Sequence, residues 1–462
     1  MERLLAAVRA RLKTEHQAQA LRAVARGVIA DERERLGVGS VPGDRRPAPV
    51  EPRSIELLAD AVVAQLAALA AGHDLGGDRH ELRPAINATG VILHTNLGRA
   101  PWPAAAIQAA TRAAGSYSLL ELDPVSGRRG PRFRAAEAHL IALTGAQDAL
   151  IVNNNATAVA LAVGLAGRRG VAVSRGELVE IGGGVRIPEI IRRAGASLVE
   201  VGTTNRTRVE DFRDPLESGR AAMVLRVHPS NFRQSGFVAV PDAAALAEVA
   251  HAHGATVVDD LGSGALLETR DLGLPHEVTP AEALAAGADL VTFSGDKLVG
   301  GPQAGLIVGR ADLVARLRRD PLARATRPDK VLLAAVAATL GLYRAGLARR
   351  EIPVWRMVGT PVEALRARAA RLAADAGPGA RVGDLTATLG GGSLPGEGIP
   401  SAGVVLSSAS PDRLLAVLRA GDPAVVGRIE AGEVVLDLRT VDPADDPRLA
   451  TALRGALRAR VP

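Results

Sequence analysis

The fold of this chain is decided by Val291-Thr-Phe-Ser-Gly-Asp-Lys-Leu-Val-Gly-Gly-Pro-Gln-Ala-Gly305, which places one lysine between two apolar runs. One run begins at Asp289 and the other is Leu306-Ile-Val-Gly309, and their composition predicts two buried strands. Burial lowers the pKa of a lysine and makes its amine nucleophilic near neutral pH. Lys297 is therefore a candidate for attaching a carbonyl cofactor, and Ser294 for holding that cofactor's phosphate. The alternative is a solvated lysine on a surface loop.

Outward from this stretch, apolar runs typical of strands alternate with helical segments from residue 140 onward. This pattern predicts an α/β domain with a mostly parallel sheet, in which ligands bind beyond the carboxyl ends of the strands. Polar residues collect at those ends: Asn154, Thr157, Arg175, His228, Asn231, Asp259 and Lys297. Their common position favours one shared site over unrelated surface residues.

Two further groups match the needs of a pyridoxal phosphate cofactor. Asp259 closes the predicted strand that begins at Ala255, and a carboxylate there can pair with a protonated pyridine nitrogen. Residues 153–157 turn from a strand into an Ala-rich helix, whose N-terminal amides favour an anion. The candidates for the phosphate contact are Asn154, Asn155 and Thr157. An ordinary Asn-rich helix cap is the alternative.

Composition excludes several classes of protein. At 462 residues the chain is too long for one ordinary domain, and its 47% hydrophobic and 23% charged residues are typical of a globular protein. The absence of cysteine excludes disulfides, thiolate metal sites and a cysteine nucleophile. The net charge of +6 permits an anionic partner without identifying one.

Nothing in the sequence predicts a membrane protein. The first residues are interrupted by charge, unlike a signal peptide. The longest apolar stretch, residues 61–71, is shorter than the roughly 20 residues that span a bilayer. A cytoplasmic location without membrane contact is therefore expected.

The first 75 residues predict a small helical domain. Apolar residues recur at helical spacing through residues 4–29 and again through residues 55–69, where Ser54 is a plausible N-cap. This domain is either a packing arm or a module that grips a large anion through its arginines. Those arginines are Arg22, Arg26, Arg33, Arg45, Arg46 and Arg53.

Residues 83–102 contain more hydrogen-bonding side chains than a core strand needs. A short strand is expected from Val91 to Leu93, with polar residues on both sides of it. These polar residues either line a site or satisfy one another at an interface between subunits. They are Asn87, Thr89, His94, Thr95, Asn96 and Arg99.

Several long segments together resemble the bacterial selenocysteine synthases, the L-seryl-tRNA(Sec) selenium transferases. Besides residues 83–102, the segments are Ser174-Arg-Gly-Glu-Leu-Val-Glu-Ile-Gly-Gly-Gly, Glu200-Val-Gly-Thr-Thr-Asn-Arg-Thr, Asp259-Asp-Leu-Gly-Ser-Gly, Ser294-Gly-Asp-Lys-Leu and Gly301-Pro-Gln-Ala-Gly. The resemblance implies a pyridoxal 5′-phosphate enzyme of the aspartate-aminotransferase-like fold (fold type I), with Lys297 forming the internal aldimine. It also implies an N-terminal domain that recognises selenocysteine tRNA, and a homodecamer built from dimers.

The implied reaction converts seryl-tRNA(Sec) to selenocysteinyl-tRNA(Sec) through an aminoacrylyl-tRNA intermediate, with selenophosphate as the selenium donor. Once the seryl amine has displaced Lys297 from the cofactor, this lysine is the base expected to remove the proton from Cα. Because the substrate's carboxyl group is esterified, arginines are available for the phosphate of the donor, and the candidates are Arg99, Arg324 and Arg327. A solvated basic helix end is the alternative for the last two. His228 is a further candidate for contact with the cofactor or substrate.

The expected domains are 1–75, helical and tRNA-binding; 76–345, the large cofactor-binding α/β domain; and 346–462, a small α+β domain. Residues 390–395, rich in glycine, are expected to close over the cofactor cleft. The competing functions are a pyridoxal enzyme that acts on a small substrate and a catalytically silent tRNA-binding protein. The N-terminal domain argues against the first, and intact Lys297 and Asp259 argue against the second.

Overall fold

The computed structural model describes residues 1–12, 16–37, 51–70, 82–129, 132, 134–181, 184–229 and 232–458. The chain forms two units, residues 1–84 and residues 85–462. No helix of the described part is both long and apolar enough to cross a membrane.

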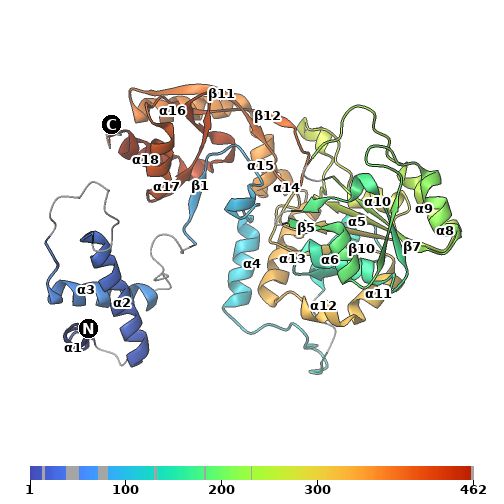
Figure 1. Cartoon of the computed structure of the whole chain (residues 1–462), viewed down its shortest axis with the longest axis horizontal. Coiled ribbons are helices and arrows are strands. Elements are labelled where there is room, and N and C mark those ends of the chain that lie inside the picture. The colour runs from blue at the N-terminus through green and yellow to red at the C-terminus, as the bar shows by residue number, and fades with distance from the viewer. Residues whose placement is uncertain are drawn as a thin grey trace. The chain divides into compact units, whose positions relative to one another are not determined.

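The first unit is a three-helix domain (Figure 1), as the sequence predicts. Its helices are α1 (Glu2–Arg9), α2 (Ala18–Arg35) and α3 (Ile55–Ala70). Apolar side chains at helical spacing, such as Leu5, Leu21 and Val62, form its core. The Ser54 hydroxyl accepts from the backbone N–H of Leu57 at 3.3 Å, which confirms the predicted N-cap.

The centre of the second unit is a seven-stranded sheet in the order β2-β10-β9-β8-β7-β3-β6. All its strands are parallel except β10, which is antiparallel to both neighbours. The predicted, mostly parallel sheet is confirmed. The strands are β2 (Asp148–Val152), β3 (Gly170–Ser174), β6 (Ser197–Val201), β7 (Ala221–Val227), β8 (Thr256–Gly262), β9 (Leu290–Ser294) and β10 (Gly305–Gly309).

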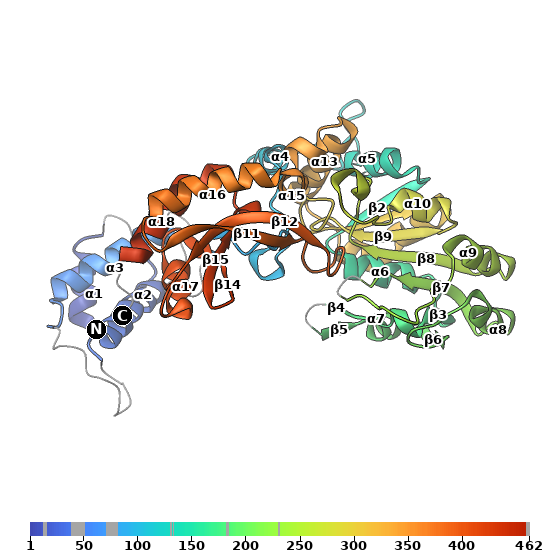
Figure 2. The same ribbon diagram turned by 90° about the horizontal axis from the view of Figure 1, so that it is seen from above.

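Helices cover both faces of this sheet, as Figure 2 shows. Two separate apolar cores result, because successive strand residues point to opposite faces. On one face lie α5 (Ala135–Thr144), α8 (Arg213–Glu217), α9 (Ala243–Ala252), α10 (Pro280–Ala285) and α13 (Lys330–Arg344). On the other lie α6 (Asn155–Gly164), α7 (Ile187–Arg193) and α11 (Ala311–Arg319).

The remaining elements of this part are short or lie outside the two layers. They are α4 (Ala104–Ala114), the hairpin of β4 (Glu180–Ile181) and β5 (Val185–Arg186), α12 (Pro321–Ala325), α14 (Ala348–Glu351) and α15 (Pro353–Gly359). Helix α4 packs along α13. Trp355 and Val358 of α15 belong to the core of the large sheet, so that core extends past the predicted domain boundary at residue 345.

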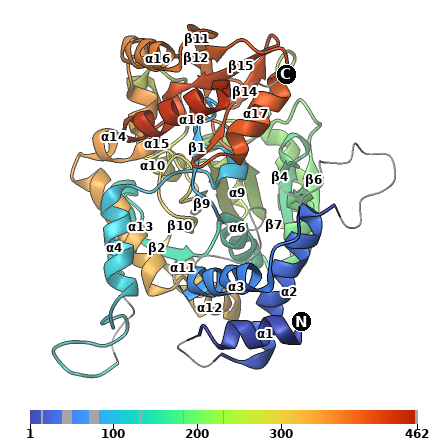
Figure 3. The same ribbon diagram turned by 90° about the vertical axis from the view of Figure 1, so that its left-hand side faces the viewer.

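A second, antiparallel sheet follows in the order β11-β12-β15-β14 (Figure 3). Its strands are β11 (Ala380–Thr388), β12 (Gly398–Leu406), β14 (Arg428–Glu430) and β15 (Glu433–Asp437). One apolar core joins it to α16 (Val362–Ala376), α17 (Pro411–Ala420) and α18 (Asp446–Arg458).

The first residues of the second unit join this C-terminal part. Strand β1 (Ala85–Asn87) pairs in parallel with β13 (Ala424–Val426). The expected strand at residues 91–93 is wrong, since Val91 makes only an isolated bridge to Thr388. The predicted boundary between residues 75 and 76 lies outside the described residues.

Candidate functional site

Lys297 lies in the loop between β9 and β10 and is 6% exposed. Burial lowers its pKa, and the nearby positive charge of Arg99 lowers it further. The carboxylates of Asp260, Asp296 and Glu277 oppose this shift. A solvated surface lysine is thereby excluded, and the amine has the environment expected of a nucleophile.

A buried hydroxyl anchors the loop between β9 and β10 that contains Lys297. The hydroxyl of Tyr343, on α13, lies 3.0 Å from the carbonyl oxygens of both Leu298 and Val299, the residues that follow the lysine. The indole Nε1 of Trp355 donates to the same hydroxyl at 2.7 Å. Because burial raises the pKa of Tyr343, this hydroxyl stays protonated and remains a donor to the loop.

A cavity of about 250 Å³ opens beside Lys297 at the carboxyl ends of the strands. The sequence-predicted residues that line it are Arg99, Asn154, Asn155, His228, Ser294 and Lys297. Asp260, Asp296 and Gln303 also line it and were not predicted. The structure thus brings six of the predicted residues together at one edge of the sheet. Asn231 lies outside the described residues.

Asp260, rather than the predicted Asp259, is the carboxylate of β8 that lines this cavity. Its Oδ1 accepts from Nδ2 of Asn155 at 2.8 Å and from the hydroxyl of Thr292 at 2.9 Å. Asp259 lines a different cavity and pairs with Arg226 at 2.7 Å. Neighbouring residues of a strand point to opposite faces, so only one of the two carboxylates can face Lys297.

Both interpretations of residues 153–157, an ordinary helix cap and an anion-binding helix N-terminus, apply to the structure. Oδ1 of Asn154 caps α6 by accepting from the backbone N–H of Thr157 at 2.9 Å. Thr157 is therefore part of the cap, and it does not line the cavity. The N-terminus of α6 nevertheless meets the cavity through Asn154 and Asn155, where its dipole favours an anion.

The polar residues of the segment 83–102 have two different roles. Oδ1 of Asn87 accepts from the hydroxyl of Thr89 at 2.7 Å, so these side chains satisfy each other. Arg99 instead lines the cavity, with its Nε 3.7 Å from Asp296 and a left-handed φ of 64°. Such a conformation is uncommon for a residue with a side chain and is concentrated at functional sites.

Arg324 and Arg327 are exposed and do not line the Lys297 cavity of this chain. Arg327 pairs with Glu121 at 3.2 Å, a carboxylate that also binds Arg129 and Arg132. The structure therefore does not bring these two arginines together with Arg99.

The lysine cavity has the features that a bound cofactor requires. A Cβ atom on Gly392, in the predicted covering loop, would lie 2.5 Å from Nζ of Lys297, so a larger residue there would require the lysine side chain to move. Nδ1 of His228 and Oδ1 of Asn155 are buried without a hydrogen-bond partner in the described structure, although both residues line the cavity. Unpaired buried polar atoms indicate partners that a ligand supplies.

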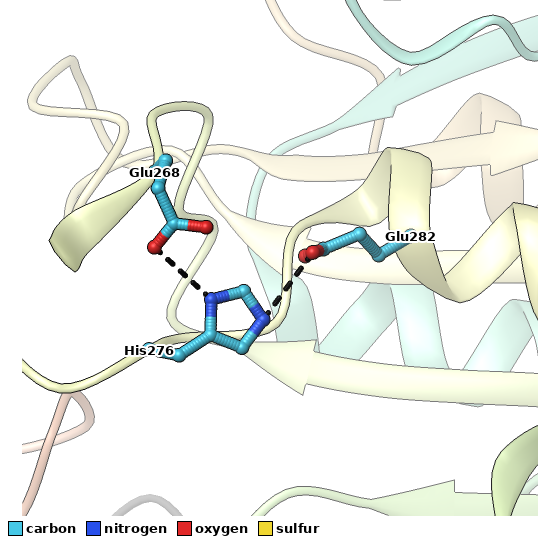
Figure 4. Close-up of side chains that lie close together, drawn as sticks. All are labelled: Glu268, His276 and Glu282. Carbon is cyan, nitrogen blue, oxygen red and sulfur yellow. Dashed lines mark hydrogen bonds and ion pairs between the residues drawn. The ribbon is translucent and has the colours of Figure 1, made fainter. Parts of the chain in front are cut away.

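A cluster of Glu268, His276 and Glu282 (Figure 4) has the composition of a metal site. The imidazole lies between the two carboxylates, 3.1 Å from Glu268 through Nδ1 and 3.3 Å from Glu282 through Nε2. Glu268 also accepts from the N–H of Arg270, and Glu282 caps α10 through Thr279. Hydrogen bonds account for this cluster, and we assign it no metal.

Comparison with known proteins agrees with this geometry. A family model described as L-seryl-tRNA selenium transferase matches residues 85–442. A curated protein of Carboxydothermus hydrogenoformans named L-seryl-tRNA(Sec) selenium transferase is 46% identical over 367 residues, which cover 78% of each chain. A protein of Rhizobium meliloti with the same name is 48% identical over 374 residues, covering 78% of this chain and 80% of that one.

Among solved structures, that of D-glucosaminate-6-phosphate ammonia-lyase aligns with a TM-score of 0.60 and 21% identity. The alignment covers 86% of this chain and 99% of that one. It bears on the fold alone, and the expected aspartate-aminotransferase-like α/β class is confirmed.

Proposed function

The chain belongs to the L-seryl-tRNA selenium transferase family, and on this premise we propose that it converts seryl-tRNA(Sec) to selenocysteinyl-tRNA(Sec) with pyridoxal 5′-phosphate as cofactor. The observation that carries the proposal is the buried Lys297, whose pKa is lowered mainly by burial. Its cavity also offers a carboxylate, a helix N-terminus and a glycine cover.

The residues of the cavity fit this cofactor. Lys297 would bind its carbonyl carbon, Asp260 its protonated ring nitrogen, and Ser294 with Asn154 and Asn155 its phosphate. When bound, pyridoxal phosphate supplies the electron sink that allows serine to lose its β-hydroxyl and accept selenium.

Lys297 also moves the proton of the reaction. A neutral amine can accept the proton from the α-carbon of the serine, and the lowered pKa keeps a larger fraction of Lys297 neutral. Gly392 packs against Lys297 and covers one side of its amine.

We propose selenophosphate as the selenium donor, held by Arg99, Arg324 and Arg327. Only Arg99 lines the cavity of one chain. Arg324 and Arg327 would have to come from a second copy of the chain, which agrees with the proposed homodecamer built from dimers. Because aminoacylated tRNA is used in the cytoplasm, this is the compartment we propose.

For the N-terminal unit, we propose recognition of selenocysteine tRNA. Arg26 and Arg33 are exposed on α2, where they are free to meet phosphates. Arg22 and Arg53 are engaged with Glu2 and Glu32 respectively. Arg45 and Arg46 lie outside the described residues.

The test uses the purified enzyme, Lys297→Ala and a matched Lys330→Ala control. The wild type and the control should show an absorbance band near roughly 410–430 nm, typical of a cofactor carried on lysine, and Lys297→Ala should lack it. With seryl-tRNA(Sec) and selenophosphate, the first two should yield esterified selenocysteine. A band without turnover or tRNA binding would instead favour a lyase for a small substrate.

A further inference from the structure

A second cavity, of about 330 Å³, lies next to the lysine cavity, and His228 lines both. Two loops form its wall. Nδ2 of Asn205 donates to the carbonyl oxygen of Phe237 at 2.6 Å, and Nε2 of Gln234 donates to that of Thr204 at 3.0 Å. These bonds hold the loops together and define a preformed hollow.

Two exposed aromatic residues lie in this region, in a chain that contains few of them. Only 2% of its residues are aromatic. Phe232 lines the cavity and is 38% exposed, and Phe237 beside it is 78% exposed. The guanidinium of Arg206 lies 4.8 Å from the centroid of the Phe237 ring. Exposed rings next to arginines are the surface on which unpaired RNA bases stack.

The interior of the cavity offers polar atoms that have no hydrogen-bond partner in the described structure. Glu277 is 2% exposed and lines the cavity, yet its Oε1 has no hydrogen-bond partner in the described structure. Nδ1 of His228 is also unpartnered. A buried carboxylate disfavours a phosphate here but suits hydroxyl and amine donors, such as those of a ribose and an adenine.

The same cavity is joined to the loop that covers Lys297. Arg233 pairs with Glu397 at 2.9 Å, and Leu394 and Pro395 complete the wall. Leu394, Pro395 and Glu397 follow Gly392 in the chain, and Gly392 lies against the lysine. A ligand in the second cavity therefore lies next to the cavity that contains the reacting amine.

We propose that this second cavity binds the 3′-terminal nucleoside of the aminoacylated RNA, with its base stacked on Phe232 and Phe237 and its donors on Glu277. The inference rests on the proposed function, because the serine is esterified to that nucleoside. Shape and stacking in this cavity then align the ester so that the serine reaches Lys297.

Two probes test the proposal with the holoenzyme: 3′-(L-serylamino)-3′-deoxyadenosine and L-serinamide, both amides that resist hydrolysis. Their Kd values are measured from the change in cofactor absorbance. The wild type should bind the nucleoside probe at least tenfold more tightly. Phe232→Ala/Phe237→Ala should reduce this preference at least fivefold, since stacking on one aromatic ring contributes about 1–3 kcal/mol per base.

Three further variants make the result specific. Ile429→Ala, which removes a side chain of similar exposure (39%) on β14, should keep the preference. Phe237→Trp should also keep it, because stacking is retained, whereas Glu277→Gln should lower it. Equal Kd values for the two probes, or a preference that survives the double variant, overturn the nucleoside site but leave the proposed function standing. A cofactor band that responds to neither probe overturns both.

Discussion

Gly392 and Lys297 are packed so closely that a Cβ atom on the glycine would lie 2.5 Å from Nζ of the lysine. The contact joins the loop before β12 to the loop after β9, which come from the two different sheets of the second unit. The small sheet therefore contributes directly to the surroundings of the reactive amine.

We predict that Gly392→Ala lowers turnover at least tenfold and weakens retention of the cofactor, because the new methyl group displaces the lysine. Gly396→Ala is the matched control: its φ is also positive, at 80°, but no atom lies within 4 Å of its added Cβ. Both variants carry the backbone strain of a left-handed alanine, about 1 kcal/mol. Turnover and cofactor absorbance measure the difference, and equal losses in both variants would contradict the steric explanation.

Substitution by asparagine distinguishes the roles of the two adjacent aspartates, Asp259 and Asp260. Asp260→Asn should reduce turnover at least a hundredfold with little change in stability, because it removes the carboxylate beside Lys297. Asp259→Asn should mainly lower the free energy of unfolding, by about 1–3 kcal/mol, because Arg226 loses its charged partner. Turnover and urea denaturation report the two quantities. Loss of turnover in Asp259→Asn alone would restore Asp259 as the cofactor's partner.

Tyr343→Phe tests the anchor of the lysine loop. Losing the hydroxyl leaves the Trp355 indole and a buried carbonyl unsatisfied, which should cost about 1–3 kcal/mol of stability. It should also lower kcat more than it raises KM, since Lys297 loses its fixed position. The control Trp355→Phe keeps the bond from Tyr343 to the loop and should retain most of kcat. A change in stability with kcat intact would show that the anchor is only structural.

Glu177 should make stability depend on pH. Burial raises its pKa to about 7, with the charge of Asp259 adding to this shift and that of Arg226 opposing it. Between pH 4.5 and 7 the folded state therefore binds more protons than the unfolded state, and stability falls as pH rises. Relative to wild type, Glu177→Gln should be stabilised by about 2 kcal/mol at pH 8, where the buried glutamate is ionised; this figure allows for the solvent that reaches part of the side chain. At pH 4.5 the glutamate of the folded protein is protonated, so the difference should be much smaller. Urea denaturation across this pH range provides the measurement, and parallel pH profiles would contradict the assignment.

The sequence predicts the strands and the lysine loop well because each is determined by neighbouring residues. Apolar runs of β-branched residues specify β9 and β10 locally, and Lys297 lies between them. The choice between Asp259 and Asp260 depends on the phase of β8, whose pairing with β9 shifts in register between Asp260 and Gly262. Because alternate residues of a strand point to opposite faces, only one of the two carboxylates can face the cavity. The alternation does not say which one.

Other parts of the site depend on contacts between distant segments, and the pattern of nearby residues carries no signal for them. Tyr343 reads as one more apolar position of a long helix, and Glu177 as part of a polar loop. The glycine-rich loop predicted to close over the cleft does lie against Lys297, but the sequence does not single out Gly392 within it. The placement of Arg324 and Arg327 with Arg99 stays a prediction, because a second chain would have to supply two of the three.

The pairing of β1 with β13 has a consequence for synthesis on the ribosome. The backbone N–H of Gly90 donates to the hydroxyl of Thr440, 350 positions later in the chain, and that of Asp437 donates to the carbonyl of Ala88. The segment that opens the second unit is thus translated long before the residues with which it pairs. The pairing of β1 with β13 therefore forms late, and a nascent chain carries the apolar Ile86 uncovered until then.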